Sequence, residues 1–472
     1  MPEYFKGVLA VALAAMAGCL LLRTIDPQSW RRPVAALAIA YGLGMGVITW
    51  VMQILSFARI KFTPISILVS LGFVALMLIL AGLRKSLGRD LPRPHPMTDA
   101  FIQSRSSSKH IWVEGMLTFL IAAQVVLTIV LTLFTPTEAY DAVAIWGLKA
   151  KAIFTAQGIP TEFLLDQNYR SYAYHPDYPL LVPLAQSYCC FLSGRFDEYV
   201  SKLIFPGFFL GCLVSMGIAG EKYGLSRSER LGLMFMLVAV PFYNSQATTG
   251  YADFVLAYYF GTGTLFLYWW VRDERLADLV VSSLLLGFAG MTKNEGLALG
   301  LVSWVVMIIF TIRDSKRSSI KARWLLCGLY FLIQFVVQLP WLIYRAYFHL
   351  SNDVVNQNAL IASLHWSTVK RLGPIFYQYQ TQIFGVRNWN IVWITLLVVL
   401  ALRGKAIMKA DSRYLLFPIL SCILIYTIIY LITPRDVVWH LKTSVSRVFL
   451  HFLPVTLLLI ARVYAGEKYQ EA

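Results

Sequence analysis

Apolar runs of about 20 residues recur along the whole chain, and this repetition constrains the fold more than any other feature. About 20 helical residues are needed to cross the hydrocarbon core of a bilayer. Hydrophobic residues make up 58% of the 472 residues and charged residues only 14%, against about 25% charged residues in soluble domains. The pattern therefore predicts an all-α polytopic membrane protein with about 11 to 13 transmembrane helices. The expected spans are 7–22, 33–56, 64–83, 112–134, 201–220, 231–248, 252–271, 277–291, 296–312, 324–346, 389–402, 414–432 and 447–461.

Lysine and arginine are distributed unevenly among the loops, and this predicts which side each loop occupies. The net charge of +16 is spread over short basic loops between apolar runs, which favours a membrane topology signal and argues against nucleic-acid binding. The basic loops, expected in the cytoplasm, are 84–109, 222–230, 272–275, 313–323 and 403–413. The opposite, outer loops are 135–200, 244–251, 292–295, 347–388 and 433–446.

The outer loops are longer and hold aromatic residues, prolines and charges of both signs, so we expect the working face there. Residues 7–22 are read as a first transmembrane helix because further spans follow directly. The six cysteines form no CxxC or His-x-Cys spacing, so we assign no metal ligand.

The outer segment 135–154 places charged residues close to hydrocarbon, where charges are expensive and usually mark a site. Asp141 precedes the segment 142–154, which fits an amphipathic helix at the membrane interface, with Val143, Trp146, Ala150 and Ile153 on one face. The Asp141 carboxylate is read either as a general base or as an N-cap of this helix.

Further along the same outer loop, His175, Asp177 and Tyr178 lie between two prolines. Such a stiff turn predicts part of a sugar-binding or acceptor-binding wall, or simply a packed loop with a satisfied carboxylate.

Three more outer segments carry polar groups. Lys293 and Glu295 occupy a turn between two apolar runs, and Asp253 opens another run. His440 and Arg447 fall near one helical face together with Asp436 and Ser444. Lys293 is read as a phosphate ligand or as one half of a Lys–Glu pair, and Arg447 as a phosphate ligand or as a side chain that reaches the interface. The convergence of these loops on one side predicts an active site there.

These segments resemble a known family. The Asp141 loop, together with TGYADFVLAYY (249–259), MTKNEGLAL (291–299) and WHLKTSVSRVFLHFLP (439–454), is similar to bacterial integral-membrane glycosyltransferases of the GT-C fold. Within that fold they resemble the large group akin to protein mannosyltransferases, aminoarabinose transferases and lipopolysaccharide-core galacturonosyltransferases, and the resemblance covers about residues 112–455.

The resemblance implies a GT-C-like fold whose long first outer loop carries interfacial helices and an acidic base. That base maps to Asp141, with Glu138 as second choice. It implies a polyprenyl-phosphate sugar donor, an inverting reaction, and an active site that faces the periplasm or exterior from the inner membrane. The chain departs from the family pattern because about three additional spans precede the acidic loop.

We expect a glycosyltransferase that moves a sugar from polyprenyl phosphate to a hydroxyl of a lipid, glycan or protein. Lys293 and Arg447 would bind the phosphate, and His175, Asp177, Tyr178, Asp253, Glu295 and His440 would contact substrate. A divalent cation stays an open alternative as cofactor. The expected divisions are extra N-terminal helices at 1–111, a catalytic module at 112–350 and a C-terminal part at 351–472.

Two other functions remain open. One is a transporter or flippase for a lipid-linked or anionic solute, which should show charged residues in mid-span and internal pseudo-symmetry. The other is an O-antigen ligase or polymerase, in which we would expect the large outer loop late in the chain, whereas here it is early.

Overall fold

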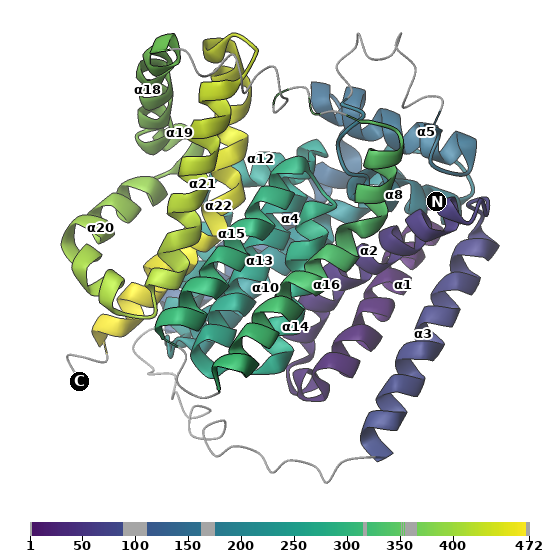
Figure 1. The fold of residues 1–472 in the computed structure, drawn as a ribbon, viewed down its shortest axis with the longest axis horizontal. Coiled ribbons are helices and arrows are strands. Elements are labelled where there is room, and N and C mark those ends of the chain that lie inside the picture. Colours follow the sequence, from purple (N-terminus) through teal and green to yellow (C-terminus); the bar gives the residue numbers. More distant parts are fainter. Residues whose placement is uncertain are drawn as a thin grey trace.

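All regular structure in the described part of the chain is helical (Figure 1). The computed structural model describes residues 2–87, 111–161, 175–314, 319–350, 352, 354 and 366–468. Within these ranges, ten helices are long and apolar enough to cross a membrane. They are α1 (Pro2–Ile25), α2 (Pro33–Phe57), α3 (Pro64–Leu87), α4 (Ile111–Phe134), α10 (Phe205–Lys222, which continues α9 and η5), α13 (Ala252–Asp273), α15 (Asn294–Arg313), α16 (Ile320–Tyr347), α21 (Arg413–Ile432) and α22 (Val437–Lys468). The chain is therefore a multi-span, all-α membrane protein.

The remaining described helices are shorter. Two are apolar, namely α8 (Leu181–Ser193) and α14 (Leu276–Gly290). The others are η1 (Pro27–Arg31), the π-helix η4 (Ala142–Gly147), α5 (Leu148–Ala156), α9 (Glu198–Ser201), η5 (Lys202–Ile204), α11 (Arg227–Val238), α12 (Pro241–Thr249), η6 (Trp366–Arg371), α18 (Leu372–Ile383), α19 (Val386–Trp389) and α20 (Val392–Lys409).

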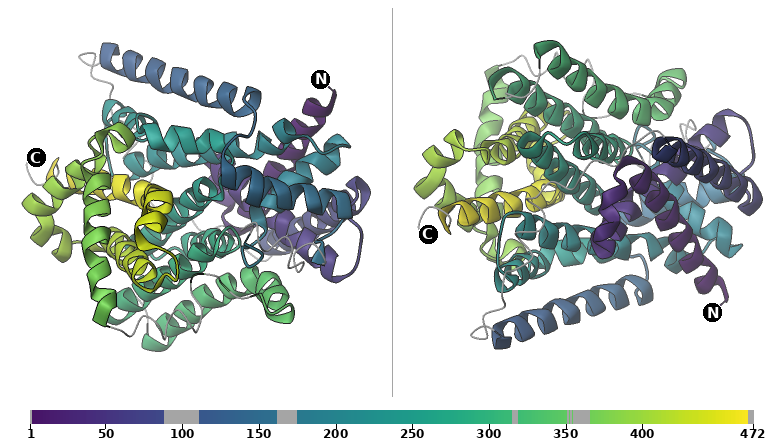
Figure 2. Two further views of the ribbon diagram at one scale, coloured as in Figure 1. Left: turned by 90° about the horizontal axis from the view of Figure 1, so that it is seen from above. Right: turned by 90° about the horizontal axis from the view of Figure 1, so that it is seen from below.

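Helix α13 forms the centre of the bundle. It packs against α10, α14, α15 and α22, and nearly all of its length is buried. Helices α3 and α4 lie at the outside, where most of their apolar side chains are exposed, and Figure 2 shows α4 along the edge of the bundle. Exposed leucine, valine and phenylalanine side chains on such helices are expected where lipid surrounds the protein.

The expected single span at 231–248 is wrong, because the structure breaks it into α11 and α12. Pro241 has no backbone N–H and restricts the residue before it, so the helix ends at Val238 and restarts at Pro241. Side chains take up the carbonyl groups freed at the break. Asn244 Nδ2 donates to the Val238 carbonyl oxygen at 2.6 Å, and Asn390 Nδ2 donates to that of Ala239 at 2.5 Å.

The predicted outer loop 135–200 contains a buried helix rather than surface loop alone. Helix α8 packs against α1, α2 and α5, and nearly all of its side chains are buried. Its apolar run is shorter than a membrane span, so run length alone did not reveal it. The interfacial position expected for 142–154 also needs correction, because Trp146 is only 1% exposed and packs inside the protein. On that face Val143 alone is exposed.

Ion pairs tie the helix ends together at the end of the bundle that holds the basic loops. Arg275 Nη2 lies 2.8 Å from Asp26 Oδ2, and Lys222 Nζ lies 2.7 Å from Asp273 Oδ2. Further pairs join Arg32 to Glu221, Arg272 and Arg462 to Asp411, and Arg413 to Asp314. These contacts gather four of the predicted cytoplasmic loops, 222–230, 272–275, 313–323 and 403–413, at one end. Most of the fifth, 84–109, lies outside the described residues. The assignment of that end to the cytoplasm stays a prediction, as do the domain divisions.

Candidate active site

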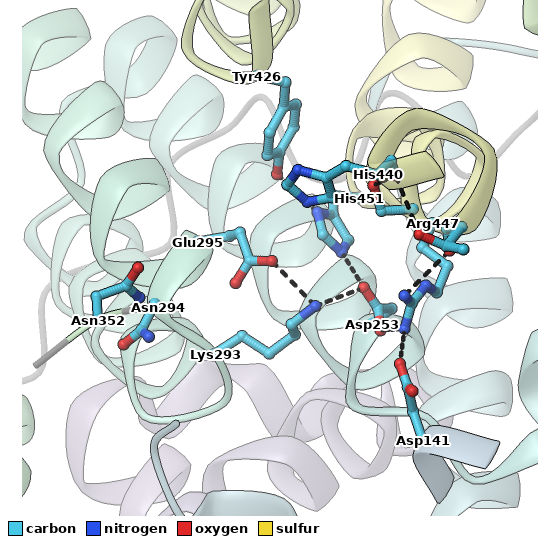
Figure 3. Close-up of polar contacts among 12 residues, drawn as sticks. Asp141, Asp253, Lys293, Asn294, Glu295, Asn352, Tyr426, His440, Arg447 and His451 are labelled. Atoms are coloured by element: carbon cyan, nitrogen blue, oxygen red, sulfur yellow. Dashed lines mark hydrogen bonds and ion pairs between the residues drawn. The ribbon is translucent and has the colours of Figure 1, made fainter. Parts of the chain in front are cut away.

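Asp253 lies at the centre of a buried group of charged side chains (Figure 3). A left-handed Gly250 (φ 83°) ends α12 and the extended Tyr251 begins α13, so Asp253 falls in the first turn of α13. Its Oδ1 accepts hydrogen bonds from Lys293 Nζ at 2.8 Å and from His451 Nε2 at 3.0 Å. A carboxylate that is 1% exposed needs such partners, because an unpaired buried charge is strongly unfavourable.

Lys293 joins Asp253 to Glu295. Its Nζ lies 3.0 Å from Glu295 Oε1, and the side chain is 5% exposed. Burial alone would lower the pKa of Lys293, but the carboxylates of Asp253 and Glu295 outweigh it and raise that pKa above its ordinary value. Close contact between α14 and α15 fixes this turn, since a Cβ at Gly296 would stand 1.9 Å from the Ala289 carbonyl oxygen.

Arg447 connects this group to Asp141. Its Nη1 forms an ion pair with Asp141 Oδ2 and lies 3.8 Å from Asp253 Oδ2. Its Nη2 donates to the Thr443 carbonyl oxygen at 3.1 Å, and its guanidinium carbon lies 5.3 Å from the centre of the Tyr251 ring. Arg447 is thus oriented by α22 and by the loop before α13.

The Asp141 carboxylate does not cap the following helix. No side-chain cap hydrogen bond forms at the start of η4, and the backbone of Asp141 is already helical. The N-cap interpretation is therefore wrong for this side chain, which is directed to Arg447 instead (Figure 3). The π-helical turn that follows it is a rare conformation that is frequent at functional sites.

Two residues that the sequence analysis did not select complete the centre. His451 Nδ1 lies 2.6 Å from Tyr426 Oη, and the histidine side chain is fully buried. A neutral imidazole has one donor and one acceptor nitrogen. If Nδ1 accepts from the tyrosine hydroxyl, Nε2–H donates to Asp253, and both nitrogens are satisfied without a charge. The signal was present in the sequence, because His451 follows Arg447 by four residues on one helix face.

His175, Asp177 and Tyr178 form a wall beside this centre. Asp177 is buried and accepts from Asn294 Nδ2 at 2.5 Å and Asn352 Nδ2 at 2.8 Å. The Tyr178 ring stacks on those of Trp146 and His175, with centroids 5.6 and 4.5 Å apart. The wall therefore joins η4 to the first turn of α15.

Lysine side chains flank the same Tyr178 ring. The Nζ atoms of Lys149 and Lys293 each lie 5.7 Å from its centre. Lys149 Nζ donates to the His175 carbonyl oxygen at 2.5 Å. Burial lowers the pKa of Lys149 to about 7, although nearby Asp177 opposes this shift.

The structure brings together most of the predicted residues, but not all. Glu138 is exposed and, within the described residues, makes no ion pair with the Asp253 group. His440 lies on the same helix as Arg447, where its Nδ1 is 3.0 Å from Thr433 Oγ1 and its ring packs edge-on against Tyr430. It is thus not joined directly to Asp253.

The described residues contain no group of three His, Cys, Asp or Glu side chains arranged to hold a metal ion. All six cysteines are free thiols. The carboxylates of the centre pair instead with lysine, arginine or histidine side chains.

Comparisons with protein-family models, with curated proteins and with solved structures found no match to this chain. The architecture that is established is an all-helical, multi-span membrane protein with about ten candidate spans.

Proposed function

We propose that the protein is a glycosyltransferase that uses a polyprenyl-phosphate-linked sugar and acts at the end of the bundle that carries Asp141. The observation that supports this most is the pairing of Asp141 with Arg447 next to the buried Asp253–Lys293 pair. A single displacement at a sugar carbon needs a base near the acceptor and cations near the leaving phosphate. In this proposal Asp141 provides the base, and Arg447 and Lys293 provide the cations.

The proposed reaction is a single displacement at the anomeric carbon of the donor sugar. The acceptor hydroxyl gives its proton to Asp141 while its oxygen forms a bond to the anomeric carbon. The bond from that carbon to the phosphate oxygen breaks, and polyprenyl phosphate leaves with the electron pair. Inversion at the anomeric carbon follows because the acceptor attacks opposite the leaving group.

Arg447 would connect binding of the donor phosphate with activation of the base Asp141. Its guanidinium is paired with the Asp141 carboxylate. A donor phosphate would compete for the same guanidinium, because phosphate accepts bidentate hydrogen bonds from arginine. Loss of that pairing frees the Asp141 oxygen for the acceptor proton, so donor binding would prepare the base.

Asp253 and its partners would act as the fixed support of this site. Lys293 is held by Asp253 and Glu295, and His451 by Asp253 and Tyr426. Preorganised charges stabilise a transition state because they need not reorient during the reaction. Lys293 would offset part of the negative charge of Asp253 and Glu295 near the leaving phosphate.

The second candidate function is a transporter or flippase for a lipid-linked or anionic solute. The break between α11 and α12 favours it, since discontinuous helices form the binding sites of many transporters. It predicts movement of the solute with no new glycosidic bond.

Mass spectrometry of cell-envelope glycans, with and without the gene, tests the proposal. Loss of one sugar from one glycan is expected, and the parental gene should restore it. Asp141→Asn should fail to restore it, because loss of a general base lowers rates by about 10²–10⁴-fold. Glu138→Gln is the matched control, since it neutralises an exposed carboxylate of the same loop. Unchanged glycans, or full restoration by the Asp141→Asn chain, would refute the proposal.

A further inference from the structure

A cleft of about 420 Å³ lies at the end of the bundle that holds the basic loops. Three helix ends form it: the first turn of α2, the last turns of α10 and the first turns of α11. Its volume falls within the range of about 300–1,000 Å³ that is usual for ligand sites. Its lining residues are Arg32, Pro33, Val34, Ala35, Val214, Gly217, Ile218, Glu221, Arg227, Arg230, Leu231 and Met234.

The charged residues of this cleft leave positive charge in excess. Arg32 Nη2 lies 2.9 Å from Glu221 Oε1, and Arg230 Nη1 lies 3.2 Å from Glu221 Oε2. A single carboxylate thus faces two guanidinium groups. Arg227 at the same mouth pairs with Glu114 of α4, and its Nε stands 3.5 Å from Oε2.

One donor of Arg230 is unused within the described part of the chain. Its Nε is buried and has no hydrogen-bond partner there. The first turn of α2, which also lines the cleft, has no side-chain cap. Donors and positive charge at a helix start favour an anion with several acceptor oxygens, such as a phosphate ester.

The rest of the lining is apolar, and this selects among phosphate-bearing ligands. Val34, Ile218, Leu231 and Met234, from three different helices, line the same cleft as the arginines. A free phosphate has no apolar atoms to contact such a surface, whereas a lipid carries hydrocarbon chains close to its phosphate.

We propose that this cleft binds an anionic glycerophospholipid, with its phosphate at Arg32 and Arg230 and acyl-chain carbons against the apolar lining. Basic clefts between transmembrane helices favour anionic headgroups, and the basic loops predict that this end faces the anionic cytoplasmic leaflet. The proposal is independent of the glycosyltransferase function, because it concerns the opposite group of loops.

Native mass spectrometry of the full chain in detergent tests this site with dioleoyl phosphatidylglycerol as probe. Dioleoyl phosphatidylcholine has the same chains without net charge, and glycerol 3-phosphate has the phosphate without the chains. We expect retention of phosphatidylglycerol alone. Equal retention of phosphatidylcholine, or displacement of the lipid by equimolar glycerol 3-phosphate, would overturn the proposal.

Substitutions that should weaken lipid binding are combined with one that should strengthen it. A variant that simply misfolds cannot bind the lipid more tightly, so the pair separates binding from folding. Arg32→Gln and Arg230→Gln should each weaken phosphatidylglycerol binding by about fivefold. Glu221→Gln should strengthen it, because the competing carboxylate is neutralised. Arg23→Gln, an exposed arginine near the end of α1, is the matched control and should change nothing. Failure of Glu221→Gln to strengthen binding, or an Arg23→Gln loss equal to that of Arg32→Gln, would refute the site.

Discussion

Arg447 is held from several directions, and this determines what a substitution there would do. Asp141 and Asp253 lie on one side of its guanidinium, the Thr443 carbonyl accepts from Nη2, and Tyr251 covers its face. Lysine keeps a charge but has neither the planar fork nor the face for ring stacking. Lysine at position 447 therefore separates the effect of the positive charge from the effect of the shape of the guanidinium group.

Arg447→Lys should lower turnover although the charge is kept. Loss of one hydrogen bond to a charged group costs about 1.5–3 kcal/mol, which corresponds to about 10- to 150-fold in rate. Sugar transfer by the purified variant, normalised to folded protein, measures this. Arg435→Lys, another arginine near the start of α22, is the control and should keep parental turnover. Parental turnover in both variants would place Arg447 outside the reaction.

Lys149 gives a prediction about pH. Between pH 7 and its ordinary value of 10.5, the folded chain has released the Lys149 proton and the unfolded chain still holds it. The unfolded state then binds more protons, so the stability contributed by this group rises with pH, by up to about 1.4 kcal/mol per pH unit. The penalty for burying its charge is fully present below about pH 7.

Lys149→Met should therefore stabilise the protein most at pH 6, and the gain should shrink towards pH 10. Thermal midpoints in detergent across this range measure the effect. Lys151→Met, which removes an exposed lysine of the same helix, is the matched control against which the Lys149→Met series is compared. A constant difference for Lys149→Met would show that the amine is not desolvated.

Among the elements, the break between α11 and α12 depends most on a distant part of the chain. Asn390 provides the hydrogen bond to the Ala239 carbonyl, and its own backbone has a positive φ of 50° with ψ −135°. Glycine adopts such a conformation freely, whereas any residue with a side chain is strained there. The residue thus has two separable roles, one in the side chain and one in the backbone.

Asn390→Ala should lower the thermal midpoint more than Asn390→Gly. Both variants leave the Ala239 carbonyl without its partner, at a cost of about 1–3 kcal/mol. Alanine keeps the backbone strain at this positive φ, whereas glycine relieves it. Differential scanning fluorimetry of the purified variants checks the order. An equal loss in both would show that the backbone conformation carries no penalty.

Run length predicted most of the long helices correctly, but it could not predict how they end or pack. The run at 231–248 is apolar up to Tyr243, and Pro241 within that apolar part indicated the break. Helix α8 is too short to count as a span, although it is buried. Asp253, Lys293 and Arg447 were predicted from position alone. Their pairing was not, because it depends on contacts between segments far apart in the chain, 198 residues for His451 and Asp253 and 306 for Arg447 and Asp141.

For the whole molecule, the loop charges predict that Glu138 is outside and Arg313 inside. On a background without the six cysteines, a membrane-impermeant maleimide should label Glu138→Cys in intact cells. Arg313→Cys should react only after the inner membrane is opened. Both side chains are exposed, so neither result depends on unfolding. The reverse pattern would invert the topology and move the proposed site to the cytoplasm.

The wide separation of the partners of Asp253 along the chain has a consequence for synthesis. Asp253 and Lys293 leave the ribosome well before His451 and Arg447, which belong to the last described helix. Until α22 joins the bundle, the Asp253–Lys293 pair lacks the imidazole and guanidinium that complete it. Nascent chains that stall before α22 would therefore present incompletely paired charges within the bilayer, a feature by which quality-control proteases and insertases can distinguish unfinished chains from finished ones.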